Sequence, residues 1–391
     1  MSNPKVMTVY GTRPEAIKVA PVIKALEADP RLESVVVSTG QHREMLDQVN
    51  GMFGINPHHD LNIMRPGQSL NGIVARAISG LDAIIEVERP DVVISQGDTS
   101  TAMAAAIAGF NRQIKIVHLE AGLRTGNLLS PFPEEANRKL IGQVSSLHLA
   151  PTEMSKANLT REAVPERDIV VTGNTVIDAL LEAASWDTQF SNERLKTFAA
   201  EDRKMVLVTT HRRENLEDMA NIGRAMRRIS ERFPEVFLVL PAHLNPAVRA
   251  AVFPEIEGRN NILITEPAPY DRFTKLMGRA YIVLTDSGGV QEEAPSLGKP
   301  VLVMRENTER PEAVEAGTVR LIGTGEDRIV DEVTELLTDA EAYERMANAV
   351  NPYGDGKASE RAVAAIAELL GVGKRIEDFV PQKAEALVFS G

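Results

Sequence analysis

A pair of glycines follows an apolar run late in this chain, in YIVLTDSGGVQEEAPSLGKP, residues 281–300. Glycine at a strand-to-helix turn lets backbone N–H groups approach an anion, so Ser287, Gly288 and Gly289 are predicted to receive a diphosphate. Glu293 lies about one helical turn deeper, too far along to oppose the phosphate and well set to accept two ribose hydroxyls. The stretch therefore predicts a nucleotide ligand, with its phosphates on the glycines and its sugar on the glutamate.

The first apolar run of the chain ends in GTRPEAIK, residues 11–18. Thr12 precedes Glu15 by the spacing of a capping box, so helix capping accounts for both residues. Arg13 would lie at the helix N-terminus, where its charge and the helix dipole attract an anion. Arg13 and Lys18 are therefore candidates for anion binding. The competing interpretation is a well-capped helix with an arginine that faces solvent.

Three further segments place carboxylates just beyond apolar runs or on a first helical turn. Asp98 lies in QGDTSTA, Glu120 in HLEAGLRTG, and Glu134 beside Glu135 in PFPEEANR. Singly, these acids have structural explanations: an N-cap for Asp98, and helix-dipole complementarity for the glutamate pair. Together they gather acids at the edge where parallel α/β folds place active sites, which predicts acid/base chemistry.

His211 and Arg212 end another apolar run, in MVLVTTHRREN, and His243 follows a later one. A histidine beside arginines at the mouth of a strand is well placed to meet an anionic ligand. No histidine pair has metal-ligand spacing on a helix, and the chain has no cysteine, so neither a metal site nor a thiol nucleophile is expected. GTGEDR at 323–328 lacks the third glycine of a dinucleotide fingerprint, so no nicotinamide cofactor is expected.

Short apolar runs alternate with longer amphipathic stretches along the chain. Consecutive apolar residues favour strands of a parallel sheet that is covered on both faces. The predicted strands are 5–10, 34–38, 91–95, 114–119, 147–150, 168–173, 205–210, 236–241, 261–265, 281–285, 300–304 and 319–323. Predicted helices between them include 17–28, 70–88, 101–109, 134–144 and 154–162, and a last helix covers about 358–370.

This pattern predicts an α/β protein of two tandem doubly wound, Rossmann-like domains, with ligands at the carboxyl ends of the strands. The first domain is expected over 1–172 and the second, nucleotide-binding domain over 173–355, while the C-terminal helix in 356–391 rejoins the first domain. The tail from Gly373 is weakly patterned and is expected to be mobile.

The composition narrows the class of protein. Of the 391 residues, 43% are hydrophobic and 25% charged, as in ordinary soluble enzymes. A formal net charge of -12 argues against nucleic acid or an anionic membrane as the main partner. The chain starts with a predicted strand, without a signal-peptide pattern, and no apolar stretch has the length of a membrane span. A cytoplasmic protein is expected.

These motifs, in this order, resemble the non-hydrolysing UDP-N-acetylglucosamine 2-epimerases. The matching segments span nearly the whole chain: GTRPEAIKVAP, TGQHREMLDQV, LNIMRPGQSL, QGDTSTA, HLEAGLRTGN, PFPEEANR, TTHRREN, DSGGVQEEAPSLGKP, RENTERPE and NPYGDGKASER. The resemblance implies a fold of glycosyltransferase-B type with a cleft between two domains, and a homodimer. It also implies a reaction without cofactor, which supplies UDP-N-acetylmannosamine for cell-surface polysaccharide. In that reaction UDP leaves C1 as the C2 proton is lost, and 2-acetamidoglucal is reprotonated on its other face before UDP returns.

The resemblance also implies roles for individual residues. The diphosphate would be held by Arg13, supported by Lys18, and by His211 and the Ser287-Gly288-Gly289 amides, with Glu293 on ribose and Phe273 on uracil. Asp98, Glu120 and Glu134 would be the acid/base and sugar-orienting groups, and His211 is counted with them as catalytic. Some family members bind a second UDP-N-acetylglucosamine as an allosteric activator. Matching positions here are Gln41, His42, Arg212 and His243, although Gly67 stands where strongly regulated relatives can carry arginine.

Four alternatives remain open. A hydrolysing epimerase would release free N-acetylmannosamine, and a related epimerase would act on a diacetamido uronic acid nucleotide. A glycosyltransferase of the same fold, or a non-catalytic nucleotide-sugar sensor, would use the nucleotide half without needing the carboxylates of the first half.

Overall fold

The computed structural model describes residues 3–40, 43–65, 67–190, 192–212 and 215–382. The chain divides into two compact units. Unit 1 comprises Met1–Ala179 together with Tyr353–Val380, and unit 2 comprises Leu180–Pro352 together with Pro381–Gly391. The helix α7 (Thr175–Ala184) carries the chain from unit 1 into unit 2. Each unit is an α/β structure with its own parallel sheet, which confirms the predicted fold class.

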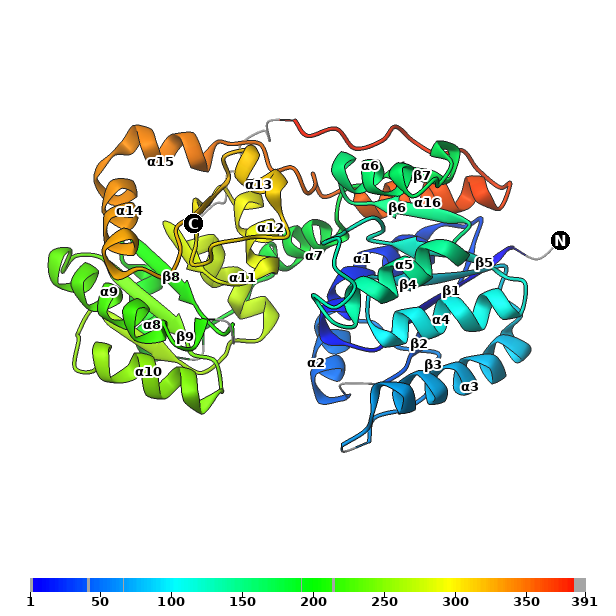
Figure 1. The fold of residues 1–391 in the computed structure, drawn as a ribbon, viewed down its shortest axis with the longest axis horizontal. Helices are drawn as coiled ribbons and strands as arrows, with labels where there is room; N and C mark the ends of the chain where they lie inside the picture. The colour runs from blue at the N-terminus through cyan, green and yellow to red at the C-terminus, as the bar shows by residue number, and fades with distance from the viewer. Residues whose placement is uncertain (1–2, 41–42, 66, 191, 213–214, 383–391) are drawn as a thin grey trace. The chain divides into compact units, whose positions relative to one another are not determined.

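Unit 1 is built on a seven-stranded parallel sheet (Figure 1). Its strands, in spatial order, are β3 (His59–Asp60), β2 (Glu33–Ser38), β1 (Lys5–Tyr10), β4 (Val92–Gln96), β5 (Lys115–Leu119), β6 (Leu147–Ala150) and β7 (Ile169–Val171). Six of the seven match predicted strands. The two-residue β3 was not predicted, because a polar pair carries no apolar signal. Every residue of β4 is buried, as expected for a central strand covered on both faces.

Helices cover the sheet of unit 1. They are α1 (Arg13–Ala28), α2 (Arg43–Phe53), α3 (Leu70–Glu88), α4 (Ser100–Asn111), α5 (Glu134–Val144), α6 (Glu153–Arg161), the 3₁₀ turn η1 (Glu166–Asp168) and α16 (Ala358–Leu369). The helices α3, α4 and α5 pack side by side, and α1 packs against α2 and α16. Apolar side chains from β1, β2, β4 and the α3–α4 pair form one core cluster. Thus α16, close to the C-terminus of the chain, completes the layer begun by the first helix.

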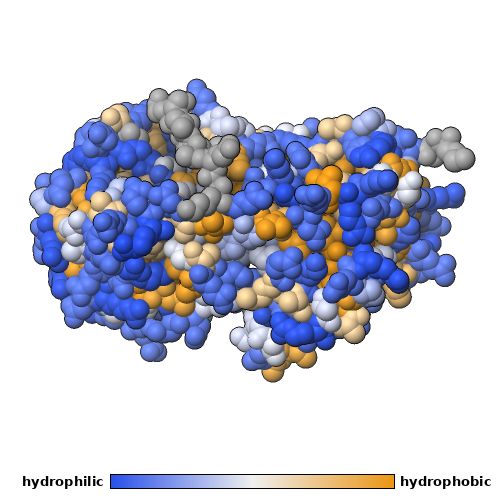
Figure 2. Space-filling model, turned by 90° about the horizontal axis from the view of Figure 1, so that it is seen from above, coloured by the Kyte–Doolittle hydropathy of each residue, from blue (hydrophilic) through white to orange (hydrophobic). Residues whose placement is uncertain are grey.

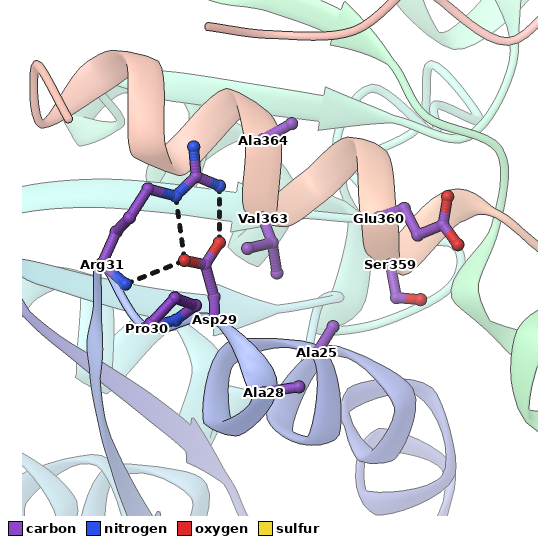
Figure 3. A pocket seen from close by; sticks show the side chains of 9 residues that line it. All are labelled: Ala25, Ala28, Asp29, Pro30, Arg31, Ser359, Glu360, Val363 and Ala364. Atoms are coloured by element: carbon purple, nitrogen blue, oxygen red, sulfur yellow. Dashed lines mark hydrogen bonds and ion pairs between the residues drawn. The ribbon is translucent and has the colours of Figure 1, made fainter. Parts of the chain in front are cut away.

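A groove of about 570 Å³ runs between the end of α1 and α16 (Figure 3). Small side chains of both helices line it, and Arg31 closes one side with hydrogen bonds to Asp29 of 2.6 to 3.0 Å. None of the predicted site residues lines this groove. The groove is therefore a feature of helix packing, away from the predicted chemistry of unit 1.

The segment after α16 packs along the edge of the sheet in unit 1. The Phe379 amide donates to the Val171 carbonyl of β7 at 2.7 Å, and the Phe379 ring is 2% exposed. Arg375 donates to the carbonyl of Arg167 at 3.1 Å. The expectation of a mobile tail from Gly373 is therefore wrong for these residues. The segment lacks a periodic pattern because it packs in an extended form along the edge strand β7, where the single buried side chain of Phe379 anchors it.

Unit 2 repeats the architecture with a six-stranded parallel sheet. The order is β10 (Ile262–Thr265), β9 (Phe237–Pro241), β8 (Met205–Thr209), β11 (Ile282–Thr285), β12 (Val301–Val303) and β13 (Val319–Leu321), and all six match predicted strands. The helices are α8 (Glu193–Ala200), α9 (Met219–Arg232), α10 (Pro246–Ile256), α11 (Tyr270–Arg279), α12 (Gly288–Ser296), α13 (Pro311–Glu315), α14 (Glu326–Thr338) and α15 (Ala340–Ala347). A single large apolar cluster joins this sheet to its helices.

Both sheets contain a topological switch point, where neighbouring strands lead to helices on opposite faces. In unit 1 it lies between β1 and β4, and in unit 2 between β8 and β11. Ligands of doubly wound folds bind beyond the carboxyl ends of such strands. Among the described residues, no helix is long and apolar enough to cross a membrane. Polar residues cover much of the face seen in Figure 2, with smaller apolar patches among them.

Candidate active site

Arg13 begins α1, directly beyond the switch-point strand β1. The predicted capping is confirmed, because the buried Glu15 carboxylate accepts the Gly11 and Thr12 amides, each at 2.7 Å. Burial raises the pKa of Glu15, and these hydrogen bonds oppose the rise. The Arg13 side chain is exposed, and no ion pair to it occurs among the described residues. Arg13 therefore remains available to an anion at a positive helix end.

Glu120 follows β5 in a backbone conformation that side chains rarely adopt, with φ of 65°. Lys18 of α1 forms an ion pair with one carboxylate oxygen, which also accepts the Asn174 side-chain amide at 3.1 Å. The Gln96 side-chain amide donates to the other oxygen at 2.7 Å. Lys18, predicted to support Arg13, is thus seen to hold Glu120. Three N–H donors surround this carboxylate, and such donors favour its charged form.

Asp98 lies between β4 and α4, beside the switch point of unit 1. Its carboxylate forms a 2.5 Å ion pair with Arg138 of α5, and its backbone carbonyl accepts the Asn137 side-chain amide at 2.8 Å. The N-cap interpretation of Asp98 is wrong, because Thr99 caps α4 and accepts the Ala102 amide. Asp98 is therefore free of a capping role and is aimed by α5.

Glu134 and Glu135 start α5 and have different surroundings. The Glu135 carboxylate is completely buried and accepts the amides of Thr125 and Gly126, each at 3.1 Å, and Arg138 at the same distance. Glu134 Oε2 is also buried, but among the described residues it has no hydrogen-bond partner. Buried polar atoms are nearly always satisfied, so Glu134 Oε2 is an atom that calls for a ligand or a proton. Glu135 is the structural member of this pair.

In unit 2, His211 follows β8 and Asp286 follows the neighbouring strand β11. His211 Nδ1 lies 3.0 Å from an oxygen of the fully buried Asp286 carboxylate, while the histidine side chain is 41% exposed. Burial alone would raise the pKa of Asp286, but the contact with His211 and backbone N–H donors lower it overall. Sequence reasoning overlooked Asp286. The adjacency of β8 and β11, which brings the two residues together, follows only from the strand order.

The predicted glycine turn starts α12, with Ser287 at the N-cap and Gly288 as first helical residue. Arg310 lies against it, because a Cβ at Gly288 would be 2.6 Å from Arg310 Nη1. Arg310 also pairs with Glu292 at 2.5 Å. The predicted Ser287 amide already donates to the Thr285 hydroxyl at 2.9 Å, so the amides that follow it at the helix N-terminus share one place with the guanidinium, which suits a diphosphate. Arg310 is a second residue that sequence reasoning missed.

Glu293 lies one turn into α12 and is 7% exposed. One of its carboxylate oxygens accepts the Tyr270 hydroxyl of α11 at 2.8 Å. Burial and the nearby Glu293 charge raise the pKa of Tyr270 well above its usual value, so the phenol remains a donor. Phe273 lies on α11 as well and is half-buried. The two residues predicted to contact ribose and uracil thus lie on neighbouring helices of unit 2.

Two of the residues assigned to an allosteric site, Arg212 and His243, lie in unit 2 beside His211. Arg212 Nη1 is 3.9 Å from Glu309, and the His243 ring centroid is 5.8 Å from that of His211. Burial, and then repulsion by His211, lower the pKa of His243. Gln41 and His42 lie outside the described residues. In the described part of the chain, no group of three or more His, Cys, Asp or Glu residues could hold a metal ion.

A family model described as UDP-N-acetylglucosamine 2-epimerase matches residues 24–367. The UDP-N-acetylglucosamine 2-epimerase of Escherichia coli strain K12 is 51% identical over 370 residues, which are 93% of this chain and 98% of that protein.

Two solved structures extend the comparison. The Neisseria meningitidis UDP-GlcNAc 2-epimerase bound to UDP-GlcNAc is 47% identical with a TM-score of 0.84, covering 93% of this chain and 100% of that one. A Methanocaldococcus jannaschii UDP-GlcNAc 2-epimerase, in complex with UDP-GlcNAc and UDP, is 34% identical with a TM-score of 0.75, covering 94% and 100%.

Proposed function

We propose, because the chain belongs to the UDP-N-acetylglucosamine 2-epimerase family, that it reversibly converts UDP-N-acetylglucosamine to UDP-N-acetylmannosamine. The family match over 24–367 carries this proposal. Acidic groups at the switch point of unit 1 and an anion-binding turn at that of unit 2 support it. A hydrolysing reaction on this substrate, or epimerisation of a related UDP-sugar, would use the same groups. Incubation in deuterated water followed by NMR distinguishes these reactions from the proposed one.

The chemistry proceeds without an external redox partner. The C2 hydrogen of the sugar is not adjacent to a carbonyl, so its direct removal near neutral pH is too slow. A base on the enzyme takes this proton while the C1–O bond breaks, and the electron pair forms the C1=C2 bond of 2-acetamidoglucal. An acid then protonates C2 from the other face as a phosphate oxygen of UDP returns to C1. Atoms and charge balance, and only the configuration at C2 changes.

Unit 2 is proposed to bind UDP. The amides of Gly288 and Gly289, with Arg310 and His211, would hold the diphosphate and stabilise its charge as it leaves, whereas the Ser287 amide already donates to Thr285. Fixed donors of this kind are worth several kcal/mol in a transition state, roughly 2.7–4 for one oxyanion contact. Glu293 would accept ribose hydroxyls and Phe273 would contact uracil. Arg13 of unit 1 would add a further positive charge on the diphosphate.

The carboxylates of unit 1 are proposed to handle the proton. Glu120 is surrounded by three N–H donors and is suited to act as the ionised base. Glu134 Oε2 receives no such donor from the described residues and is suited to carry a proton for the opposite face. In the reverse direction the two exchange roles. Asp98, fixed by Arg138, would orient the sugar.

The finer biological assignments rest on the family resemblance. We propose a homodimer that acts in the cytoplasm and supplies cell-surface polysaccharide synthesis. A second UDP-N-acetylglucosamine would act as an activator through Arg212, His243 and the segment of Gln41 and His42. Analytical ultracentrifugation would test the dimer. Activation predicts a sigmoidal dependence of rate on UDP-N-acetylglucosamine concentration, and this dependence should become hyperbolic in Arg212→Ala.

The proposal is tested by incubating the protein with UDP-N-acetylglucosamine in deuterated water and following the anomeric protons by NMR. Deuterium at C2 of both UDP-sugars is the expected result. Free N-acetylmannosamine with UDP would assign a hydrolysing reaction, and an unchanged spectrum would contradict epimerase activity on this substrate.

Amide variants of the three carboxylates, Asp98→Asn, Glu120→Gln and Glu134→Gln, should bind UDP but lose turnover. The exposed Glu153→Gln on α6 is the matched control and should behave as wild type. Full turnover in all three variants would remove these carboxylates from the mechanism.

A further inference from the structure

The contact between His211 and Asp286 constrains where the histidine carries its proton. The two residues follow β8 and β11, whose register pairs Thr209 with Thr285. The first residues beyond a parallel pair of strands therefore lie near each other. The register of the two strands therefore sets this contact.

Only one ring nitrogen of His211 can make this contact. Asp286 accepts the His211 backbone amide at 2.9 Å and also lies 3.0 Å from Nδ1. Nδ1 is the ring nitrogen near the main chain, so a single carboxylate can bridge it and the backbone amide. Nε2 lies on the far side of the ring, and among the described residues no hydrogen bond reaches it.

Asp286 is arranged as an acceptor. Besides His211, its carboxylate accepts the Thr210 hydroxyl at 3.0 Å, the Arg212 amide at 2.9 Å and, more weakly, the Asn215 side-chain amide at 3.4 Å. A fully buried carboxylate with this many donors is ionised, and an ionised carboxylate cannot donate a hydrogen bond. The proton in the contact must therefore belong to Nδ1.

We infer that Asp286 is a positioning residue that keeps a proton on His211 Nδ1 and leaves Nε2 to face the diphosphate of the ligand. The identity of that ligand rests on the proposed function. In water, neutral histidine favours the opposite tautomer, with the proton on Nε2, so the protein imposes the less common form. The leaving UDP then meets a ring whose free nitrogen is already aimed outward.

Other charged groups around His211 fit this assignment. His243, at the end of β9, lies 5.8 Å away between ring centroids, and Arg212 is adjacent in the chain. Arg212 is itself 3.9 Å from Glu309. With UDP in place, a second proton on Nε2 would let the ring donate to a phosphate oxygen while Nδ1–H still donates to Asp286. Burial lowers the pKa of His243 and so favours its neutral form, which leaves Arg212 as the cation among these neighbours.

Nitrogen-15 NMR of histidine-labelled protein tests the tautomer directly. The chain has seven histidines, and the His211→Gln variant identifies the signal by its loss. In free enzyme at a pH where His211 is neutral, the expected pattern has a protonated Nδ1 and an unprotonated Nε2. Addition of UDP should change Nε2 to the protonated form. A proton on Nε2 in the free enzyme would overturn the inference.

Two variants separate positioning from general structural damage. In Asp286→Asn, the tautomer pattern should move toward Nε2–H, and kcat/KM should fall about 10- to 100-fold, as on losing a carboxylate partner of a functional histidine. The control Thr210→Val removes one hydroxyl donor to Asp286 but no charge, and should keep the wild-type tautomer. An unchanged His211 signal in a folded Asp286→Asn protein would contradict the positioning role.

The outcome does not depend on whether the enzyme is an epimerase. If Asp286→Asn fails to fold, the wild-type spectrum still decides the tautomer. If the tautomer is as expected but deuterium exchange at the C2 position is absent, the proposed function fails and the pairing stands. If exchange occurs while Nε2 carries the proton in free enzyme, the inference fails and the epimerase activity stands.

Discussion

The backbone at Glu120 predicts an unusual order of stability among its variants. A residue with a Cβ pays roughly 1–2 kcal/mol in the left-handed region, where Glu120 lies with φ of 65°. Replacement by glycine removes this strain, while the more flexible unfolded chain costs about 0.4–1 kcal/mol. Glu120→Gly should therefore be more stable than Glu120→Ala by about 1 kcal/mol. Both variants lose the same contacts with Lys18, Gln96 and Asn174, so these cancel in the comparison.

Differential scanning calorimetry measures the difference. For a unit of this size, about 1 kcal/mol corresponds to a shift in Tm of roughly 2–4 °C. The matched control is Ala75→Gly, on an exposed position inside α3, where glycine should instead lower stability by about 1 kcal/mol. The shift caused by this control also identifies the transition that belongs to unit 1.

A result in which Glu120→Ala equals or exceeds Glu120→Gly in stability would refute the strain argument. The expected result would mean that position 120 keeps a side chain although the backbone conformation there is more stable with glycine. Both variants should also lack turnover, because neither has the carboxylate. Position 120 would then be a case in which stability is sacrificed for chemistry.

Three further predictions concern other contacts. Gly288→Ala should displace the Arg310 guanidinium, because its Nη1 would lie 2.6 Å from the new Cβ. UDP binding, measured by isothermal titration calorimetry, should weaken about 10-fold. An unchanged Kd would contradict the proposal that Arg310 and the glycine turn hold the diphosphate together. Burial would raise the pKa of Glu309, but the hydrogen bond from Arg305 lowers it from the ordinary 4.5 to about 2. The ionised carboxylate therefore stabilises unit 2 fully above pH 4.5, and this stabilisation is lost as the pH falls to 2. Glu309→Gln should flatten the acid side of the stability curve, and identical curves would exclude the contribution. Phe379→Ala should lower the free energy of unfolding of unit 1 by about 3 kcal/mol in urea titrations, whereas a change below about 1 kcal/mol would mean that the tail adds little.

Most of the fold was predictable because each buried strand carries its own signal. Runs such as DVVIS and YIVLT are apolar on both faces, and parallel sheets require such runs. The order of the strands has no such local signal, because it depends on which crossover each helix makes. The short strand β3 and the packing of Phe379 on β7 also depend on neighbours far away in the chain. Periodicity cannot report those contacts.

The site was predictable only in part, for a similar reason. Glycines and acids at the ends of strands were visible, since position in the sequence marks the edge of the sheet. The N-cap explanation considered for Asp98 was wrong because Thr99, one residue later, offers an equally good oxygen and has the extended backbone of a cap. Arg310 and Asp286 were missed because their partners, Gly288 and His211, are brought to them by the tertiary fold.

Unit 1 is assembled from two segments that are far apart in the sequence, and this affects how it folds during synthesis on the ribosome. The strands and helices of Met1–Ala179 are made before Leu180–Pro352, but α16 and the segment that covers β7 are made after it. Until then, the flank of α1 that receives α16 and the edge of β7 remain uncovered, and uncovered edges invite association with other chains. The long segment Leu180–Pro352 of unit 2 is made before unit 1 can close. Unit 1 therefore begins to form before this segment and is completed only after it.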